Sequence, residues 1–316
     1  MLLRLLNRLG ILVASLVVSS VVVFAFMAVL PGDPARVALG VNASDAAVAQ
    51  LRTDFGLDRP LPVQYVSWVT GLVTFDPGTS YVSGIAIAPQ LVDRLQVTLI
   101  LVGVAMLLAL VVAVPMGTVM AVRHRKLSGL ALSAVAQLGV AVPGFLAGIL
   151  LITVFAVTLG WLPANGWTPP AQDPVMFVKQ LILPVLSLGL VQAAVLTRYV
   201  RSAVLDVLRE DYLRTARSKG LTPGRALVRH GLRNAAVPVV TVLGLQLATL
   251  LIGAVVVERV FVIPGLGSLL LDSVSQRDLI VVQDVVMLLV VAVLVVNFVV
   301  DLLYLVIDPR LRAGAR

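Results

Sequence analysis

Long apolar runs separated by short charged segments dominate the pattern of the chain. Six intervals hold enough apolar residues to cross about 30 Å of hydrocarbon as a helix of ~20 residues. They are Leu9–Gly32, Leu95–Val122, about 132–159, Gln180–Thr197, Asn234–Val257 and Val285–Val300, the last extending to Ile307 if Asp301 lies near an interface. Pro115, Pro143 and Pro184 should kink or start helices. The pattern predicts an all-α, polytopic membrane protein with six transmembrane helices.

The composition supports this fold class. Of the 316 residues, 59% are hydrophobic and 13% are charged, whereas soluble domains average about 45–50% and ~25%. There is no cysteine, which excludes disulfides and thiolate metal sites. A net charge of +8 would suggest nucleic acid in a soluble protein. In a membrane protein it reflects basic cytoplasmic loops, so no nucleic-acid partner is expected.

The distribution of basic residues predicts the orientation of the helices. If both termini are cytoplasmic, 17 of the 24 Lys and Arg residues lie on inner segments and 7 on outer ones. The first apolar run exceeds the ~7–15 residues of a signal-peptide core. We therefore expect an uncleaved first helix, with the N-terminus and the C-terminus in the cytoplasm.

Two parts of the chain differ in organisation. Residues 1–94 should hold the first transmembrane helix and an extracytoplasmic loop of short helices, and residues 95–316 a five-helix core. Within the loop, Ser44 or Asn42 can cap a helix. The apolar residues at helical spacing behind this cap are Val48, Leu51 and Phe55. A second amphipathic stretch spans Pro62–Thr74, and the loop is either a passive connector or a docking surface.

The inner loop at about 198–236 carries nine basic and three acidic residues. Leu205, Leu208, Tyr212 and Ala216 have the spacing of one helical stripe. Gly220 can end that helix with a positive φ, and Thr222-Pro223 can cap and begin another. We expect a helix, a glycine elbow and a second helix. Ala216 and Gly220 would let the elbow approach another protein closely, and the alternative is an amphipathic hairpin on anionic lipid.

Several chemistries have no matching motif. None of the three lysines is followed by Ser or Thr, so there is no Walker A loop and no ATP hydrolysis is expected of this chain. There is no Gly-x-Ser-x-Gly nucleophile elbow. His124 and His230 lie far apart without a His-Glu-x-x-His pattern, and no metal site is predicted.

Polar residues inside the predicted spans are candidates for function. Asp284 and Asp301 fall near the ends of the last span, where water should reach them. Gln192, Gln246 and Asn297 lie deeper. They either line a solute pathway or form hydrogen bonds between helices.

Residues 211–221, Asp-Tyr-Leu-Arg-Thr-Ala-Arg-Ser-Lys-Gly-Leu, resemble the "EAA" loop of ABC importer permeases of the dipeptide/oligopeptide/nickel branch. Arg214 and Thr215 stand at the positions of Glu and the first Ala, and Ala216 and Gly220 match. Further stretches of the same branch are Pro31-Gly32-Asp33-Pro34, Leu183-Pro184-Val185-Leu186-Ser187-Leu188, Glu258-Arg259-Val260-Phe261 with Pro264-Gly265-Leu266-Gly267, and Asp308-Pro309-Arg310. Phe75-Asp76-Pro77-Gly78 departs from the usual Gly-Asp-Leu-Gly type of turn.

This resemblance implies a type I ABC importer permease fold in a bacterial plasma (inner) membrane, in contact with lipid. It implies a second homologous permease, two cytoplasmic ATPase subunits that use ATP and Mg, and an extracytoplasmic solute-binding protein. This chain would hold no cofactor and catalyse no reaction. The residues that would couple it to the ATPases are Tyr212, Arg214, Thr215, Ala216, Lys219, Gly220 and Leu221.

The implied function is to form, with the second permease, the pathway of an importer of dipeptides or oligopeptides. Nickel or glutathione carried by the same machinery is an alternative. A stand-alone secondary carrier is an alternative of another class; a midplane carboxylate or an inverted repeat would favour it, and neither is found in the sequence. A membrane scaffold that binds lipid through its basic loop is a third hypothesis.

Overall fold

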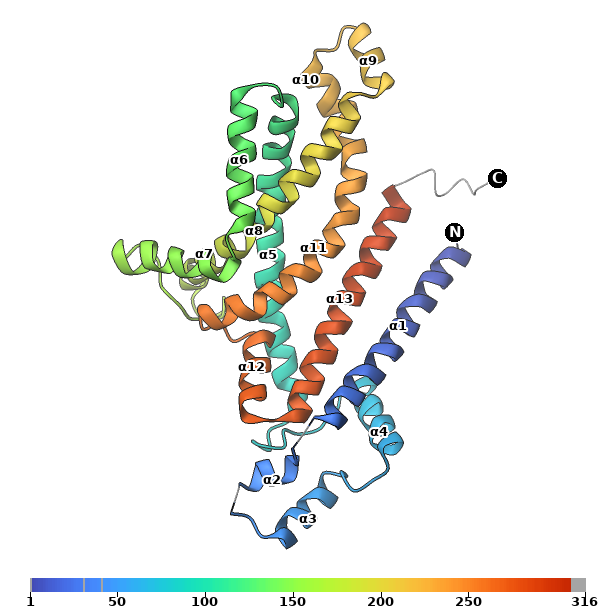
Figure 1. The fold of residues 1–316 in the computed structure, drawn as a ribbon, viewed down its shortest axis with the longest axis vertical. Coiled ribbons are helices and arrows are strands. Elements are labelled where there is room, and N and C mark those ends of the chain that lie inside the picture. The colour runs from blue at the N-terminus through green and yellow to red at the C-terminus, as the bar shows by residue number, and fades with distance from the viewer. Residues whose placement is uncertain (1, 31, 41, 308–316) are drawn as a thin grey trace. The chain divides into compact units, whose positions relative to one another are not determined.

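The computed structural model describes residues 2–30, 32–40 and 42–307, and these are helical almost throughout (Figure 1). Five described helices are long and apolar enough to cross a membrane. They are α1 (Leu2–Val29), α5 (Ile87–Val122), α8 (Pro174–Leu208), α11 (Leu232–Val260) and α13 (Leu279–Ile307). The described residues contain no strand beyond one isolated bridge between Thr79 and Ala86. The predicted all-α class is confirmed.

The third predicted span is not one straight helix. α6 (Leu127–Ala141) is followed by α7 (Gly144–Leu151) and the π-helix η1 (Ile152–Thr158), with a bend of 97° between them. Val142 is extended before Pro143, because a proline disfavours helical backbone in the residue before it. The part of the chain that the structure describes therefore has five candidate spans, or six if the bent pair counts as one.

The other two prolines do not interrupt their helices. Pro115 lies within the 36 residues of α5, and Pro184 lies within the 35 residues of α8. α8 also runs well beyond the predicted Gln180–Thr197, because its polar ends continue as helix outside the apolar run. Asp173 caps its first turn, accepting hydrogen bonds from the backbone N–H groups of Val175 and Met176 at 3.0 Å.

The chain divides into two compact units. The large unit comprises Leu99–Ile263 and the end of α13 from Val296. The small unit comprises Leu2–Thr98 and Pro264–Val295. Each unit thus contains one part of α5 and one part of α13.

Within the large unit, helices approach closely where glycine removes the side chain. A Cβ on Gly117 of α5 would lie 2.7 Å from Cβ of Val200 on α8. A Cβ on Gly189 of α8 would lie 2.8 Å from Cδ2 of Leu108 on α5. Small residues at such contacts are typical of membrane helices, whose association depends on close packing.

We expect Gly117→Val to destabilise the large unit, because the new side chain must displace Val200 and α8. Overpacking of this kind costs about 1–3 kcal/mol. Gly103→Val, on the same helix, is the matched control, since a Cβ at Gly103 meets no atom within 4 Å. Thermal unfolding in detergent should show a lower midpoint for the Gly117 variant only. Equal midpoints for the two variants would contradict the α5–α8 contact.

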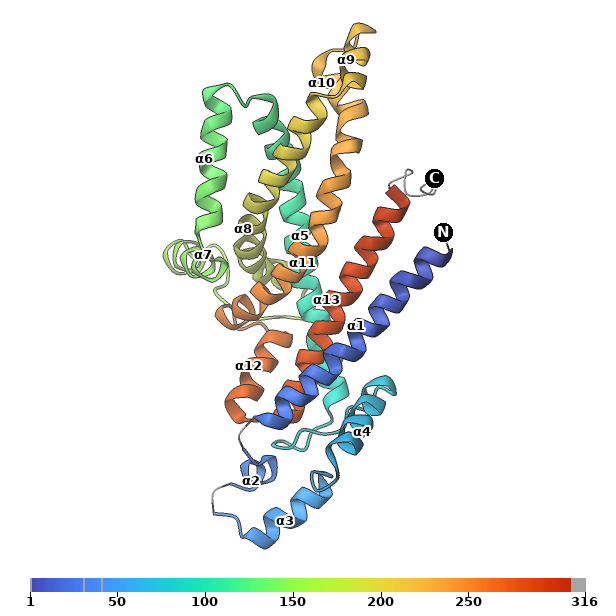
Figure 2. The same cartoon turned by 45° about the vertical axis from the view of Figure 1, so that its right-hand side comes forward.

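The small unit contains the helices of the long loop predicted after the first span. They are α2 (Pro34–Leu39), α3 (Asp45–Asp54) and α4 (Leu61–Val73), with α12 (Leu266–Gln276) joining from later in the chain. Ser44 caps α3, accepting a hydrogen bond from the Ala47 N–H at 3.3 Å, which confirms the first of the two predicted caps. α4 lies beside α1 (Figure 2), and Trp68 of α4 packs in one buried cluster with Val23 of α1.

Two buried carboxylates tie the loop of the small unit to α13 and the residue before it. The Trp68 indole N–H donates to Oδ1 of Asp284 at 2.7 Å. Asp278 accepts hydrogen bonds from the Ser80 hydroxyl and, at 3.3 Å, from the Tyr81 N–H. The prediction that water reaches Asp284 is wrong, since α4 contributes to covering it and its exposure is 0%. Its second oxygen, Oδ2, has no hydrogen-bond partner among the described residues.

Candidate functional site

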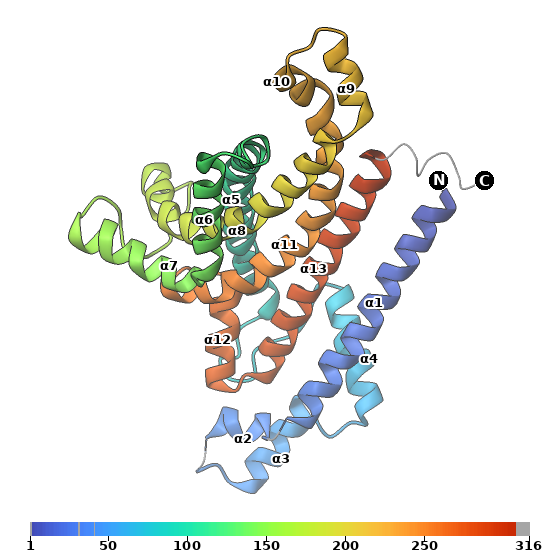
Figure 3. The ribbon, with the colours of Figure 1, turned by 45° about the horizontal axis from the view of Figure 1, so that its top comes forward.

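The segment between α8 and α11 forms the predicted helix, elbow and helix. α9 spans Asp211–Ser218 and α10 spans Pro223–Ala226, followed by the π-helix η2 (Leu227–Gly231). In all views the two short helices lie at the tip formed by the ends of α8 and α11 (Figures 1 and 3).

Gly220 is the residue on which the elbow turns. Its φ is +91°, a conformation that glycine adopts without a steric penalty. The Gly220 N–H donates to Arg217 O at 3.0 Å, and the Leu221 N–H donates to Ala216 O at 3.3 Å. These two bonds form a Schellman motif, which satisfies the last carbonyl groups of α9. The prediction that Gly220 ends this helix with a positive φ is confirmed.

The second helix begins as predicted. Pro223 is its first residue, and Thr222 is its N-cap. The Thr222 hydroxyl accepts a hydrogen bond from the Arg225 N–H at 3.4 Å. Proline fits the first helical position because no partner is available there for an N–H.

A buried cluster fixes the elbow to the helices on either side. Leu213 of α9 packs with residues of α8, α10, η2 and α11. The buried members also include Val204, Val207, Ala226, Leu227 and Ala235, and Ala216 and Leu221 pack against them. Gly231 fits tightly here, since a Cβ on it would lie 2.7 Å from Cδ1 of Leu227. The elbow is therefore packed against the ends of α8 and α11.

The outer face of the elbow is polar and basic. Tyr212, Arg214, Thr215, Lys219 and Gly220 are all exposed. Arg214 lies 3.5 Å from the carboxylate of Asp211, but both side chains are exposed, so this ion pair adds little stability. A Cβ on Gly220 would meet no atom of the chain within 4 Å. Another protein could therefore approach the backbone here.

Leu205, Leu208, Tyr212 and Ala216 do not form the one stripe of a continuous helix that the sequence predicted. α8 ends at Leu208, and α9 starts anew after Arg209 and Glu210. The restart changes the helical phase, so Leu213 is buried and Tyr212 is exposed. Asp211 at the first turn of α9 was the available signal, since acidic residues favour helix N-termini.

The sequence matches known families over nearly its whole length. A family model described as "binding-protein-dependent transport system inner membrane component" matches residues 113–313. A model for the N-terminal part of such membrane components matches residues 1–102. The chain belongs to this family.

Two relatives extend the same match. The glutathione transport system permease protein GsiC of Salmonella typhi is 41% identical to this permease over 310 residues, 97% of this chain and 98% of the relative. GsiC of Escherichia coli (strain K12) is 41% identical over 309 residues, 97% of each chain. An inward-facing structure of the MetNI methionine ABC transporter has the same fold, with a TM-score of 0.57 at 20% identity over 69% of this chain and 96% of that one.

These matches assign the chain to the permease subunits of ATP-driven, binding-protein-dependent importers. The permease is a multi-pass inner membrane protein and a non-catalytic subunit, since ATP is hydrolysed by partner ATPases. Family members work with another permease, with ATPases and with a binding protein.

The three deeper polar candidates in the permease's spans, Gln192, Gln246 and Asn297, lie in the large unit. The Gln192 side-chain N–H donates to the side-chain oxygen of Gln246, which links α8 to α11. Oδ1 of Asn297 lies 3.0 Å from the position of a Cβ on Gly244. The glutamine pair has the geometry of an interhelical hydrogen bond, and a role of the three residues in lining the pathway stays a prediction.

Proposed function

We propose that this permease carries short peptides into the cell, with glutathione as the specific candidate. The observation that supports this is 41% identity over 97% of the chain to permeases of glutathione transport systems. Glutathione is itself a tripeptide, so the original hypothesis of dipeptides or oligopeptides and the glutathione alternative share one substrate class. Nickel is the second candidate, from the branch that the sequence resembles.

The elbow of α9 and α10 is, in this proposal, the contact with a cytoplasmic ATPase. Its exposed residues Arg214, Thr215 and Lys219, with Gly220 at the turn, would enter a cleft of the ATPase. Ala216 and Leu221 would act from beneath by fixing the elbow to the buried cluster. Because that cluster joins the elbow to α8 and α11, movement of the ATPase would reach both helices as a rigid-body displacement.

The proposed assembly has two permeases, two ATPases that hold ATP and Mg, and one extracytoplasmic binding protein. The elbow lies in the cytoplasm, as do both termini, whereas the loop helices α2 to α4 face outward. This orientation is supported by the 17 basic residues that it assigns to inner segments.

Proteoliposomes that contain the four membrane-associated subunits and the binding protein test the proposal. We expect uptake of radiolabelled dipeptide or glutathione to require ATP on the elbow side and binding protein on the other side. Uptake of ⁶³Ni²⁺ without uptake of peptide would identify nickel as the substrate instead. Uptake without ATP that a protonophore abolishes would identify a secondary carrier instead.

A further inference from the structure

The small unit has an open cavity of about 520 Å³, lined by its loop segment and by residues of α1 and α13. This volume lies within the range of small-molecule sites, roughly 300–1,000 Å³. One part of the wall is aromatic, with Phe24, Phe55, Trp68 and Tyr81. The rings of Phe55 and Tyr81 stack with centroids 4.3 Å apart. The cavity thus offers apolar surface for a side chain of a ligand.

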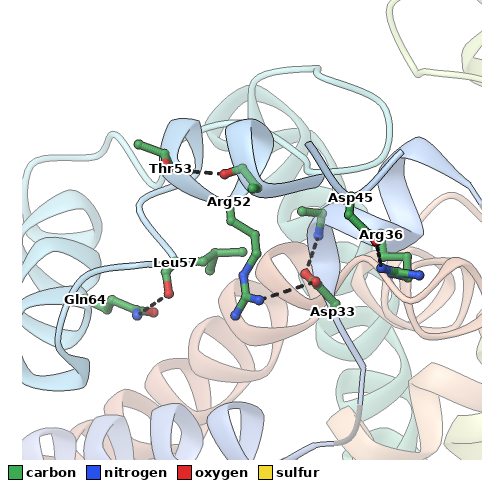
Figure 4. Close-up of polar contacts among 9 residues, drawn as sticks. Asp33, Arg36, Asp45, Arg52, Thr53, Leu57 and Gln64 are labelled. Carbon is green, nitrogen blue, oxygen red and sulfur yellow. Dashed lines mark hydrogen bonds and ion pairs between the residues drawn. The ribbon is translucent and has the colours of Figure 1, made fainter. Parts of the chain in front are cut away.

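Charged residues of both signs complete the wall. Arg52 lies 3.8 Å from Oδ2 of Asp33 (Figure 4), and Asp54 accepts a hydrogen bond from Gln50. Two charged groups of the wall have no ion pair and no side-chain hydrogen bond among the described residues. They are the guanidinium of Arg59 and the carboxylate of Asp76. One cation and one anion are therefore available in the same cavity.

The backbone that carries these two charges is held in place. The Gln64 side chain donates to Arg59 O at 2.7 Å and to Leu57 O at 3.2 Å (Figure 4 shows the second bond). A Cβ on Gly56 would lie 3.4 Å from Nε of Arg59, so the arginine side chain folds over this glycine. The Asp76 N–H donates to Gly71 O at 2.8 Å.

Hydrogen bonds within the small unit also hold the aromatic wall in place. Trp68 is held by its hydrogen bond to Asp284, and the Tyr81 backbone is held by Asp278. Burial, with the negative charges of Asp284 and Asp278, raises the pKa of Tyr81 to about 12, so its phenol is neutral at pH 7. A wall that does not reorganise on binding loses less affinity to ordering.

We propose that this cavity binds a short zwitterionic peptide, with its carboxylate at Arg59, its ammonium group at Asp76 and a side chain against the aromatic wall. Arg52 also lines the cavity and supplies a second guanidinium. The inference rests on the proposed function in taking a peptide as the solute. It adds a solute-binding site in the loop helices of this chain, separate from any site between the two permeases.

The charges of the ligand identify it as a zwitterion. A purely anionic ligand would leave Asp76 unpaired and would face Asp33 and Asp54 as well. A purely cationic ligand would leave Arg59 unpaired. A peptide with free termini satisfies both, and charge-assisted hydrogen bonds are the stronger class.

The test measures binding of radiolabelled L-alanyl-L-alanine to the complex of both permeases and both ATPases in nanodiscs, without binding protein. Arg59→Ala and Asp76→Ala should each weaken binding at least tenfold, as expected for loss of a charge-assisted hydrogen bond. Arg36→Ala is the matched control: Arg36 is an exposed arginine of the same loop that pairs with Asp45 at 2.7 Å (Figure 4) and does not line the cavity. It should bind as the unmodified protein does.

Blocked probes assign each terminus. N-acetyl-alanyl-alanine should bind weakly and be insensitive to Asp76→Ala, and alanyl-alanine amide should be insensitive to Arg59→Ala. Equal binding of the peptide by the Arg59, Asp76 and Arg36 variants would overturn the site. A complex that binds the solute-binding protein but binds no free peptide would overturn it as well. If the complex instead transports ⁶³Ni²⁺ and no peptide, the proposed substrate fails, which is a different result from loss of the cavity.

Discussion

Replacing Gly220 with tryptophan should reduce ATP-driven solute uptake at least tenfold while the chain stays in the membrane. Gly220 has a φ of +91°, which costs a residue with a side chain about 1–2 kcal/mol. The space above it is open within the chain, so an indole there would occupy the volume that the ATPase must enter. Uptake and ATP hydrolysis are measured in parallel in proteoliposomes.

Two further variants separate strain from obstruction. Gly220→Asn keeps a residue that tolerates a positive φ and should retain most of the uptake. Val228→Trp adds the same bulk at an exposed position of η2, beyond the elbow, and should leave uptake near normal. Normal uptake by the Gly220→Trp permease would remove the elbow from the coupling mechanism.

Trp68→Phe should destabilise the small unit by about 2–4 kcal/mol. The indole N–H is the one hydrogen-bond donor to the buried carboxylate of Asp284 among the described residues, and phenylalanine leaves that carboxylate without a partner. A buried polar or charged group that loses its hydrogen-bond partner is no longer compensated for its lost contact with water, which lowers the free energy of unfolding. The measurement is thermal unfolding of the purified permease in detergent.

Trp161→Phe is the control for this prediction, because Trp161 is 67% exposed. It should leave the midpoint of unfolding unchanged. The double variant Trp68→Phe with Asp284→Leu should recover part of the lost stability, since it removes both polar partners. If the Trp68→Phe and Trp161→Phe variants unfold at the same temperature, the hydrogen bond between Trp68 and Asp284 does not contribute to the stability of the small unit.

The transmembrane helices and the elbow could be predicted because their signals are local. An apolar run of ~20 residues is sufficient to indicate a span. Gly220 and Thr222-Pro223 carry the conformations of a helix end and a helix start in their own backbone preferences. Among the described residues, the structure has five of the six predicted spans as single helices, and it confirms the elbow with the bonds that cap α9 and α10.

The features that the sequence missed depend on tertiary contacts or on helical phase. The bend at Pro143 could not be distinguished from the continuous helices at Pro115 and Pro184, because all three prolines lie in similar apolar sequence. Burial of Asp284 requires Trp68, which lies 216 positions earlier in the chain. The cavity of the small unit has no sequence motif of its own.

The packing beneath the elbow would give the proposed coupling a physical route. Leu213 anchors α9 to Val207 at the end of α8 and to Leu227 before α11. Since interiors are close-packed, displacement of the elbow shifts these neighbours with it instead of being absorbed. A force on one short loop can thus reorient two transmembrane helices.

Cross-linking at the elbow tests the central claim most directly. The natural chain has no cysteine, so Lys219→Cys introduces a single reactive thiol. We predict a disulfide between this position and a cysteine placed in the cleft of the ATPase. Val82→Cys, at an exposed residue of the small unit, should form none. Labelling of the Lys219→Cys thiol by a membrane-impermeant reagent from outside the cell, with no cross-link to the ATPase, would contradict both the orientation and the coupling site.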